Sequence, residues 1–259
     1  MAGRLEGRIA IVTGGGSGIG KASAKKMASE GAVVIVNDIN GRTAAETADE
    51  IRAAGGTAHA HPGDVTSRAD VDALVDGAVA RHGRLDIVHN NAGGGTTVPI
   101  LEMSDEHFVH DIELNLHSVF FGIRAALRVM VPQGRGSIIS TSSGAGLGAV
   151  PGLAAYGSAK AAVIMLTRCA AVEYAHTGVR INAIAPGSMG TPAFGQWLDS
   201  MPVGLVGYEA QIPQHRLGRA DEIADAAAWL ASDESSYVNG AVIPVDGGCW
   251  AKFASPTFD

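Results

Sequence analysis

Short apolar runs rich in β-branched residues alternate with segments of helical periodicity along almost the whole chain of 259 residues. Each run has the length and composition of a strand buried on both faces. Strands that alternate with helices form a parallel sheet with right-handed crossovers. We therefore predict an α/β fold: a single domain, doubly wound and of Rossmann type, with about seven parallel strands and helices on both faces. The predicted strands span residues 8–13, 32–37, 57–61, 85–90, 136–141, 179–185 and 241–245, and the predicted helices span 18–30, 42–54, 67–82, 104–131, 156–176 and 220–232.

Charge and composition disfavour several kinds of partner. The net charge is −7 and Lys and Arg are not clustered, so we expect neither nucleic-acid nor membrane binding. The first apolar stretch is shorter than that of a signal peptide and no segment approaches the ~20 residues that span a bilayer, which favours a cytoplasmic protein. Cys169 and Cys249 are expected to be buried, reduced thiols. His107, His110 and Asp111 could share a helix face, but the spacing suggests no further ligand, so no metal site is predicted.

The sequence VTGGGSGIGKAS at residues 12–23 predicts a phosphate-binding turn after the first strand. A glycine turn that leads into a helix presents free N–H groups and the positive end of the helix dipole to a phosphate. The phosphate loop of nucleotide triphosphatases needs a hydroxyl where Ala22 stands, which disfavours that class. A dinucleotide site needs an acidic residue at the end of the second strand, and Asp38 follows Gly20 by 18 residues.

A series of further motifs, in their order and spacing, resembles the short-chain dehydrogenase/reductase family over about residues 5–250. The resemblance implies an oxidoreductase that transfers a hydride between a nicotinamide cofactor and an alcohol or ketone. The motifs are TGGGSGIG (13–20), DV (64–65), NNAG (90–93), Asn115 within ELNLHS, STSSGAG (140–146), YGSAK (156–160), PG (186–187) with Thr191, and VDGG (245–248).

Tyr156 and Lys160 are four residues apart, so on a helix they share one face. Oxidation of an alcohol needs a base, and a tyrosine with a pKa near 10 becomes competent near neutral pH if an adjacent ammonium lowers that pKa by about 2–3 units. We expect Tyr156 to be this base, or the acid in the reductive direction, and Lys160 to lower its pKa. The resemblance implies that Ser143 binds the substrate oxygen, with Ser142 as the alternative, and that Asn115 links Lys160 to a water chain.

The resemblance also implies the residues that bind the cofactor. Asp64 and Val65 correspond to the pair that receives the adenine, Lys160 to the residue that holds the nicotinamide ribose, and Thr191 to the residue that holds the carboxamide. The full predicted set is Gly14, Ser17, Gly18, Ile19, Gly20, Asp38, Ile39, Asp64, Val65, Asn91, Ala92, Gly93, Tyr156, Lys160, Pro186, Gly187, Met189 and Thr191.

The residues around the predicted acidic position favour NAD over NADP. The carboxylate of Asp38 would repel the 2′-phosphate of NADP, and Ser17 and Ile39 stand where NADP-dependent relatives usually carry Arg or Lys. Arg42 lies four residues beyond and could reach a phosphate, so NADP stays as the less favoured cofactor.

The predicted substrate pocket is mostly apolar, which suits a secondary alcohol or ketone with a hydrophobic body. A segment rich in Gly, Pro and Met, residues 188–215, has weak periodicity and is the predicted lid. Two alternatives remain open: a 3-oxoacyl-carrier or hydroxysteroid-type reductase that uses NADP(H), and a protein that senses NAD(H) without turnover. The predicted pocket residues are Gly95, Ala145, Val150, Trp197 and Tyr208.

The tail at residues 250–259 carries three aromatic residues and is expected to pack on a pocket or on a neighbouring subunit. The resemblance implies a homotetramer in which the helices at 104–131 and 156–176 form an interface.

Overall fold

The predicted strands form one parallel sheet in the computed structural model, which describes residues 3–199 and 204–252. The strand order is β3-β2-β1-β4-β5-β6-β7, so the direction of winding reverses between β1 and β4. This confirms the predicted doubly wound fold, and each strand lies within two residues of its predicted range. The strands are β1 (Ile9–Thr13), β2 (Val33–Asp38), β3 (Thr57–Pro62), β4 (Ile87–Asn90), β5 (Gly136–Thr141), β6 (Val179–Pro186) and β7 (Val242–Val245).

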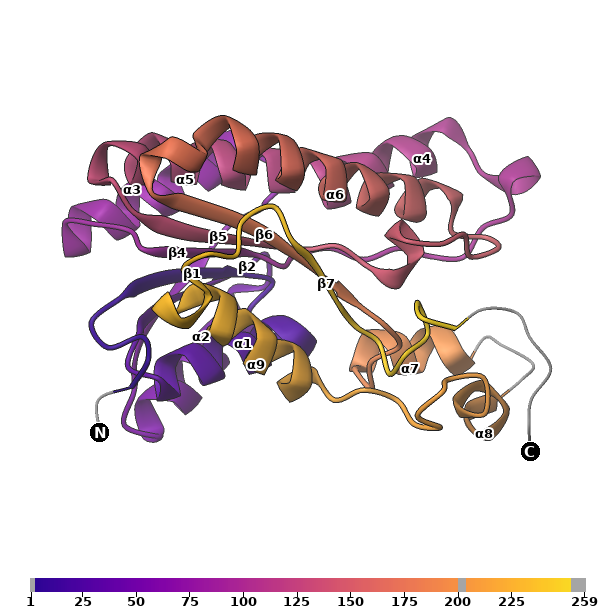
Figure 1. Cartoon of the computed structure of the whole chain (residues 1–259). Coiled ribbons are helices and arrows are strands. Elements are labelled where there is room, and N and C mark those ends of the chain that lie inside the picture. The colour runs from indigo at the N-terminus through magenta and orange to yellow at the C-terminus, as the bar shows by residue number, and fades with distance from the viewer. Residues whose placement is uncertain (1–2, 200–203, 253–259) are drawn as a thin grey trace.

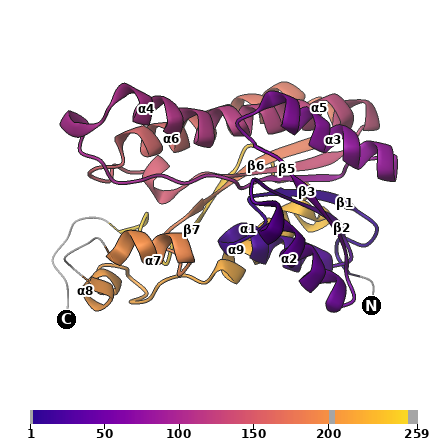
Figure 2. The same ribbon diagram turned by 180° about the vertical axis from the view of Figure 1, so that it is seen from behind.

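Helices cover both faces of the sheet, and the two groups of helices enclose separate apolar cores (Figure 1). One face carries α1 (Gly18–Ser29), α2 (Gly41–Ala53) and α9 (Ala220–Ala231), and the other carries α3 (Arg68–His82), α5 (Ser118–Gln133) and α6 (Ala154–Tyr174). The view from behind shows the same three layers (Figure 2). Short 3₁₀ turns span Ile100–Glu102, Gly144–Gly146, Ala175–Thr177 and Asp233–Ser235.

The helix predicted at 104–131 consists of three helical pieces. α4 (Asp105–Ile112) continues through a π-helical turn, Glu113–His117, into α5. By length and composition this run, Asp105–Gln133, could cross a membrane, so the expectation that no segment approaches that length is wrong. Half of its most apolar window is buried inside the protein, and such burial is typical of a core helix that packs on a sheet.

Two short helices in the predicted lid have no counterpart in the sequence prediction. α7 (Pro192–Asp199) and α8 (Gly204–Glu209) lie beyond the carboxyl ends of the strands, next to β7 in Figure 1. The Gly and Pro content of this segment hides its helical periodicity. Residues 200–203 of the lid and 253–259 of the tail lie outside the described residues.

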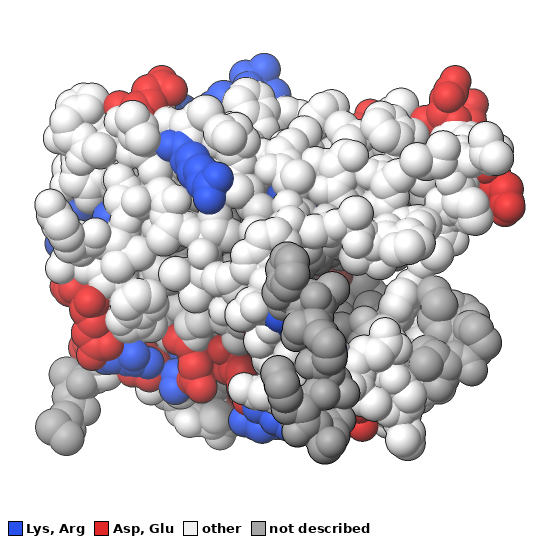
Figure 3. Space-filling view, turned by 45° about the vertical axis from the view of Figure 1, so that its right-hand side comes forward, with Lys and Arg blue, Asp and Glu red and all other residues white. Residues whose placement is uncertain are grey.

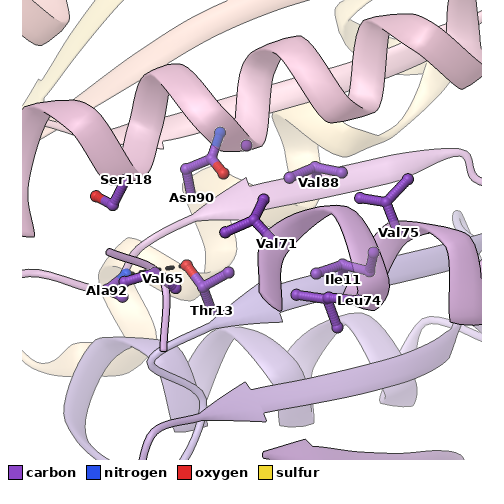
Figure 4. A pocket seen from close by; sticks show the side chains of 11 residues that line it. Ile11, Thr13, Val65, Val71, Leu74, Val75, Val88, Asn90, Ala92 and Ser118 are labelled. Atoms are coloured by element: carbon purple, nitrogen blue, oxygen red, sulfur yellow. Dashed lines mark hydrogen bonds between the residues drawn. The ribbon is translucent and has the colours of Figure 1, made fainter. Parts of the chain in front are cut away.

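A small cavity of about 10 Å³ lies between the sheet and the layer of α3 and α5 (Figure 4). Asn90, the first residue of the NNAG motif, points into this region, and its amide nitrogen has no hydrogen-bond partner among the described residues. A Cβ on Gly122 would lie 2.0 Å from Asn90 Oδ1, so α5 packs directly on this side chain. Asn90 therefore supports the core beneath the sheet.

His89 of β4 predicts how the fold responds to acid. Its ring is fully buried, one ring nitrogen contacts Thr141 Oγ1 at 2.9 Å, and burial lowers the pKa of His89 to about 4. The unfolded chain binds a proton here near pH 6.5 and the folded chain does not, so stability is lost as the pH falls from about 6.5 to 4, by up to roughly 3 kcal/mol from this group. We expect His89→Gln to show a smaller loss in urea denaturation over this range. His61→Gln, on the edge strand β3, serves as the control and should follow the wild type; equal pH slopes for all three proteins would contradict the prediction.

Candidate active site

A cleft of about 760 Å³ opens at the carboxyl ends of the strands, where their order reverses. Most residues that the sequence predicts for the site line this cleft, whereas Gly20 and Asn115 lie behind its wall. The predicted residues in the lining are Gly14, Ser17, Gly18, Ile19, Asp38, Ile39, Asp64, Val65, Asn91, Ala92, Gly93, Gly95, Ser143, Ala145, Val150, Tyr156, Lys160, Pro186, Gly187, Met189, Thr191, Trp197 and Tyr208.

The glycine turn owes its shape to backbone conformation and close contact. Gly14 and Gly18 have φ values of 63° and 50°, in the left-handed region that favours glycine. A Cβ on Gly20 would lie 2.0 Å from the carbonyl oxygen of Gly14. Gly20 therefore lets the first turn of α1 pack against the end of β1, and it shapes the cleft from behind.

The N-terminus of α1 faces the cleft without a side-chain cap. Ser17 occupies the N-cap position, but its side chain accepts no hydrogen bond from the helix. By contrast, Asn40, Ser67 and Ser104 cap α2, α3 and α4. The first N–H groups of α1 are thus available to an anionic group, because free donors and the helix dipole both favour negative charge there.

The carboxylate of Asp38 is oriented at the same end of the cleft by two backbone donors. Gly16 N–H donates to one carboxylate oxygen and Asn40 N–H to the other, both at 2.9 Å. Arg42, the basic residue nearest to Asp38 in the sequence, instead pairs with Glu46 at 2.6 Å. The cleft therefore presents a fixed negative charge here.

Thr13 ties the end of β1 to the loop after β4. Its hydroxyl oxygen accepts hydrogen bonds from the N–H groups of Asn91 at 3.0 Å and Ala92 at 3.1 Å. The side-chain amide of Asn91 donates back to the Thr13 carbonyl at 3.1 Å. These bonds fix the floor of the cleft between the two strands.

Asp64 and Val65, which correspond to the pair that receives the adenine, have different surroundings. The Asp64 carboxylate accepts from both the N–H and the hydroxyl of Thr66 at 2.8 Å, which shapes the turn after β3. Val65 presents an apolar side chain that packs on the core beneath the sheet.

Tyr156, in the first turn of α6, meets Ser143 across the cleft. Burial raises the pKa of the Tyr156 hydroxyl, a hydrogen bond with Ser143 lowers it, and the nearby Asp111 carboxylate raises it further. The net direction is upward, opposite to the predicted lowering, because burial of the phenol is the largest influence on this pKa. Lys160 Nζ lies 5.6 Å from the centre of the Tyr156 ring and donates to a backbone carbonyl.

Lys160 is a buried ammonium with few partners. It is 2% exposed, and its Nζ donates to the Thr141 carbonyl at 2.9 Å. Burial lowers the pKa of Lys160 to about 8. A Cβ on Gly93 would lie 3.0 Å from Nζ, so the loop after β4 passes directly over the ammonium.

Asn115 holds that loop from below. It lies in the π-helical turn, fully buried, and its side-chain amide both accepts from Gly94 N–H at 3.0 Å and donates to the Gly94 carbonyl at 2.7 Å. The same amide nitrogen also donates to the Asp111 carbonyl, one helical turn earlier, at 2.9 Å. Asn115 thus fixes the backbone beside Lys160.

The two candidate serines after β5 have different surroundings. Ser142 is buried, and its hydroxyl donates to the Lys160 carbonyl at 2.8 Å. Ser143 is partly exposed, and its hydroxyl oxygen accepts from Ala145 N–H at 3.1 Å. Ser143 can therefore donate its own proton to Tyr156 or to a bound oxygen, whereas the Ser142 hydroxyl is used to hold α6.

The loop after β6 crosses the cleft towards the glycine turn. The Thr191 hydroxyl accepts from Phe194 N–H at 3.3 Å and so begins α7. Its methyl group would lie 3.5 Å from a Cβ on Gly18. Gly187 leaves room for Asp246, and Met189 bridges to Gly218.

The predicted set of pocket residues omits several residues that line the cleft, although most of them fall within the predicted lid, the VDGG motif or the tail. They are Leu153, Ser188, Phe194, Asp246 and Trp250. Trp250 belongs to the tail, whose predicted packing on a pocket its position fits. Phe194 and Ser188 flank Thr191 in the sequence, and that proximity was the available signal.

Both cysteines are exposed, which contradicts the expected buried thiols. Cys169 falls on a face of α6 that points away from the sheet, and Cys249 lies in the cleft lining. Among the described residues, no group of three or more His, Cys, Asp or Glu side chains could hold a metal ion.

Comparison with known proteins assigns the chain to a group of enzymes. Residues 14–249 match the family model described as enoyl-(acyl carrier protein) reductase. The 2,5-dichloro-2,5-cyclohexadiene-1,4-diol dehydrogenase of Sphingobium indicum is 41% identical, with 96% of this chain and 98% of the relative covered. The cyclohexanol dehydrogenase of an Acinetobacter strain is 37% identical, with 97% of this chain and 98% of the relative covered. A 7α-hydroxysteroid dehydrogenase solved with NADH and 7-oxo glycochenodeoxycholic acid has a TM-score of 0.90 and 38% identity, with 95% of each chain covered.

The buried ammonium of Lys160 predicts a stabilising substitution. Because the folded-state pKa of about 8 lies below the unfolded value of about 10.4, Lys160 destabilises the fold below pH 8, and this cost disappears as the pH rises to about 10.4. We expect Lys160→Met to raise the free energy of unfolding by roughly 1–3 kcal/mol at pH 7, measured in urea.

The control is Lys25→Met, on the exposed face of α1, which should stay within about 0.5 kcal/mol of the wild type. The difference between Lys160→Met and the wild type should shrink between pH 8 and 10.4. A less stable Lys160→Met protein at pH 7 would show that the bond to Thr141 outweighs the desolvation of the ammonium.

Proposed function

The chain belongs to the short-chain dehydrogenase/reductase family of oxidoreductases, and we propose that it transfers a hydride between NAD(H) and a secondary alcohol or ketone with a hydrophobic body. One observation carries this proposal: a single cleft has a glycine turn and Asp38 at one end and Tyr156, Ser143 and Lys160 at the other. The first end suits a dinucleotide, and the second suits proton transfer to or from an alcohol oxygen.

The residues of the cleft fit NAD. The uncapped N-terminus of α1 would bind the pyrophosphate, and Asp38 would accept hydrogen bonds from the adenosine ribose. Val65 and the loop that begins at Asn91 would enclose the adenine, while Thr191 and the backbone at Met189 would hold the carboxamide. When bound, the oxidised nicotinamide ring accepts the hydride and brings a positive charge into the cleft.

Tyr156 would move the proton in either direction. In oxidation the phenolate takes the proton of the substrate hydroxyl as the C–H bond breaks, and in reduction the phenol returns it to the carbonyl oxygen. Ser143 would donate a hydrogen bond to the same oxygen and steady its developing charge. Since burial raises the pKa of Tyr156, the phenolate must be stabilised by cations in the assembled site, of which Lys160 is the one that the protein supplies.

Lys160 is suited to hold a ribose hydroxyl and to pass protons. Its ammonium uses one donor on Thr141, and the pKa near 8 lets it release a proton at mildly alkaline pH. Asn115 acts through the loop at Gly94, which it positions, and we propose that it also orders water beside Lys160.

The proposal extends to the remaining parts of the chain. Residues 188–215 would form the substrate lid of one dinucleotide-binding and catalytic domain, and residues 250–259 would complete the pocket or contact a neighbouring subunit. Phe120 of α5 and Met165 and Val172 of α6 are exposed apolar residues, which supports a homotetramer built on these helices. We also propose that the protein is cytoplasmic.

Replacing Tyr156 tests the proposed chemistry. We expect Tyr156→Phe to lower kcat for secondary alcohols with NAD by roughly 10²–10⁴-fold, because the phenol is the proton acceptor. Wild-type oxidation should quicken as the pH rises and the phenolate forms. Tyr156 is also in the predicted cofactor-binding set, so binding of NADH, followed by fluorescence, should weaken by at most about tenfold, the value of roughly one hydrogen bond. The control Tyr174→Phe, at the far end of α6, should retain full turnover. NADH binding without turnover by the wild type across a broad panel of alcohols and ketones would favour a sensor.

Replacing Asp38 tests the choice of cofactor. We expect the wild type to prefer NAD to NADP by at least about 100-fold in kcat/KM, and Asp38→Ser to lower this ratio at least about tenfold, because it removes both the ribose acceptor and the charge that repels a 2′-phosphate. Arg42→Ala is the control, since Arg42 pairs with Glu46. A large change in the ratio on Arg42→Ala, or none on Asp38→Ser, would contradict this assignment.

A further inference from the structure

The lid end of the cleft is walled by three aromatic side chains that contact one another. Phe194 and Trp197 of α7 and Tyr208 of α8 have ring centroids 5.3–5.7 Å apart, and two of the three pairs meet edge to face. All three line the cleft. Such a wall favours contact with a ring-shaped apolar body.

Two hydroxyl groups meet in this wall. Ser188 Oγ and Tyr208 OH lie 2.7 Å apart, and either can donate to the other. One hydrogen lies between the two oxygens, so the pair keeps one further O–H donor and several lone pairs for a third group. The indole N–H of Trp197, in contrast, already donates to Thr97 Oγ1 at 2.6 Å.

Ser188 of the hydroxyl pair and Ser143 follow two neighbouring strands of the sheet. β5 and β6 are paired with Thr141 opposite Ile184, and the two loops that follow carry Ser143 and Ser188. A Cβ on Gly144 would lie 3.5 Å from the Pro186 carbonyl oxygen, so these loops run side by side. The pair therefore borders the place where Tyr156 and Ser143 would bind the reacting oxygen.

The charge of the cleft restricts what can bind there. Lys160 is the sole Lys or Arg in the lining that the structure describes, and its ammonium lies beside Thr141 and the loop at Gly93, away from the lid. The Asp246 carboxylate accepts from the N–H groups of Gly248 and Trp250. Most of the surface seen in Figure 3 likewise carries no charged side chain. An anionic substrate would find no cationic partner at the lid end, and its desolvation would go uncompensated.

We propose that the hydroxyl pair of Ser188 and Tyr208 binds a second oxygen, a hydroxyl or carbonyl, on an uncharged ring-shaped substrate whose first oxygen reacts at Tyr156. This inference rests on the proposed hydride transfer and specifies its substrate class. The aromatic wall selects the ring, the hydroxyl pair selects the second oxygen, and the absence of a Lys or Arg at the lid end of the described lining disfavours acids.

Matched ketones with one reacting carbonyl test the proposal. We expect the wild type with NADH to prefer 4-hydroxycyclohexanone to cyclohexanone roughly five- to tenfold in kcat/KM, which is the value of about one hydrogen bond. Tyr208→Phe and Ser188→Ala should each lower kcat/KM for the hydroxylated ketone about five- to tenfold more than for cyclohexanone. Tyr237→Phe, a fully exposed tyrosine, is the control and should not alter the ratio. 4-Oxocyclohexanecarboxylate should be at least about tenfold poorer than 4-hydroxycyclohexanone.

The outcomes separate the inference from the function on which it rests. Equal losses for both ketones in Tyr208→Phe would mean that the hydroxyl only packs the lid, and this would overturn the inference while leaving hydride transfer in place. If no ketone is reduced, the proposed function fails. The inference about the second oxygen is then tested by ligand binding alone. Titration of intrinsic fluorescence, to which Trp197 contributes, should then show that wild-type protein with NADH binds the hydroxylated ring more tightly than cyclohexanone, and that Tyr208→Phe removes the difference.

Discussion

A positive charge held away from water organises the functional end of this fold. The Lys160 ammonium has one hydrogen bond from the described chain, to Thr141, and the structure is built closely around it. Ser142 bonds the Lys160 carbonyl, and Gly93 and Gly146 approach so closely that a Cβ on either would meet Lys160 within 3.0 Å. Burial of this kind costs stability, and proteins commonly accept such a cost where a site needs a group with a shifted pKa.

The sequence predicts the scaffold closely because the physics of the scaffold is local. Short runs between the helical segments identify all seven strands, although β3 and β7, at the two edges of the sheet, are not fully buried. The right-handed crossover rule then leaves few topologies. The prediction failed where tertiary contacts decide the outcome. The π-helical turn at Asn115 inserts one residue into an otherwise regular pattern so that its amide can pair with Gly94, and periodicity does not report such an insertion. α7 and α8 were not predicted because glycine and proline interrupt their helical periodicity.

The candidate site divides in the same way. Motif order predicts which residues gather at the cleft, and nearly all of them line it. It does not predict their electrostatics: a spacing of four residues suggests that Lys160 acts on the Tyr156 hydroxyl, but the burial of the phenol reverses the expected direction of the pKa shift. The Ser188–Tyr208 contact joins residues 20 positions apart across a loop and a helix, and no local sequence pattern predicts it.

The hydroxyl of Thr13 has a consequence for how molecules pass in and out of the cleft. It accepts two bonds from the loop after β4 at the crevice where the winding reverses, and the Asn91 side chain adds a third bond, to the Thr13 carbonyl. The crevice cannot widen by separating these two strands unless all three bonds and the backbone pairing of β1 with β4 break. On the lid side of the cleft, by contrast, α7 and α8 attach by loops and pair with no strand of the sheet, so they can shift without breaking the pairing of the strands.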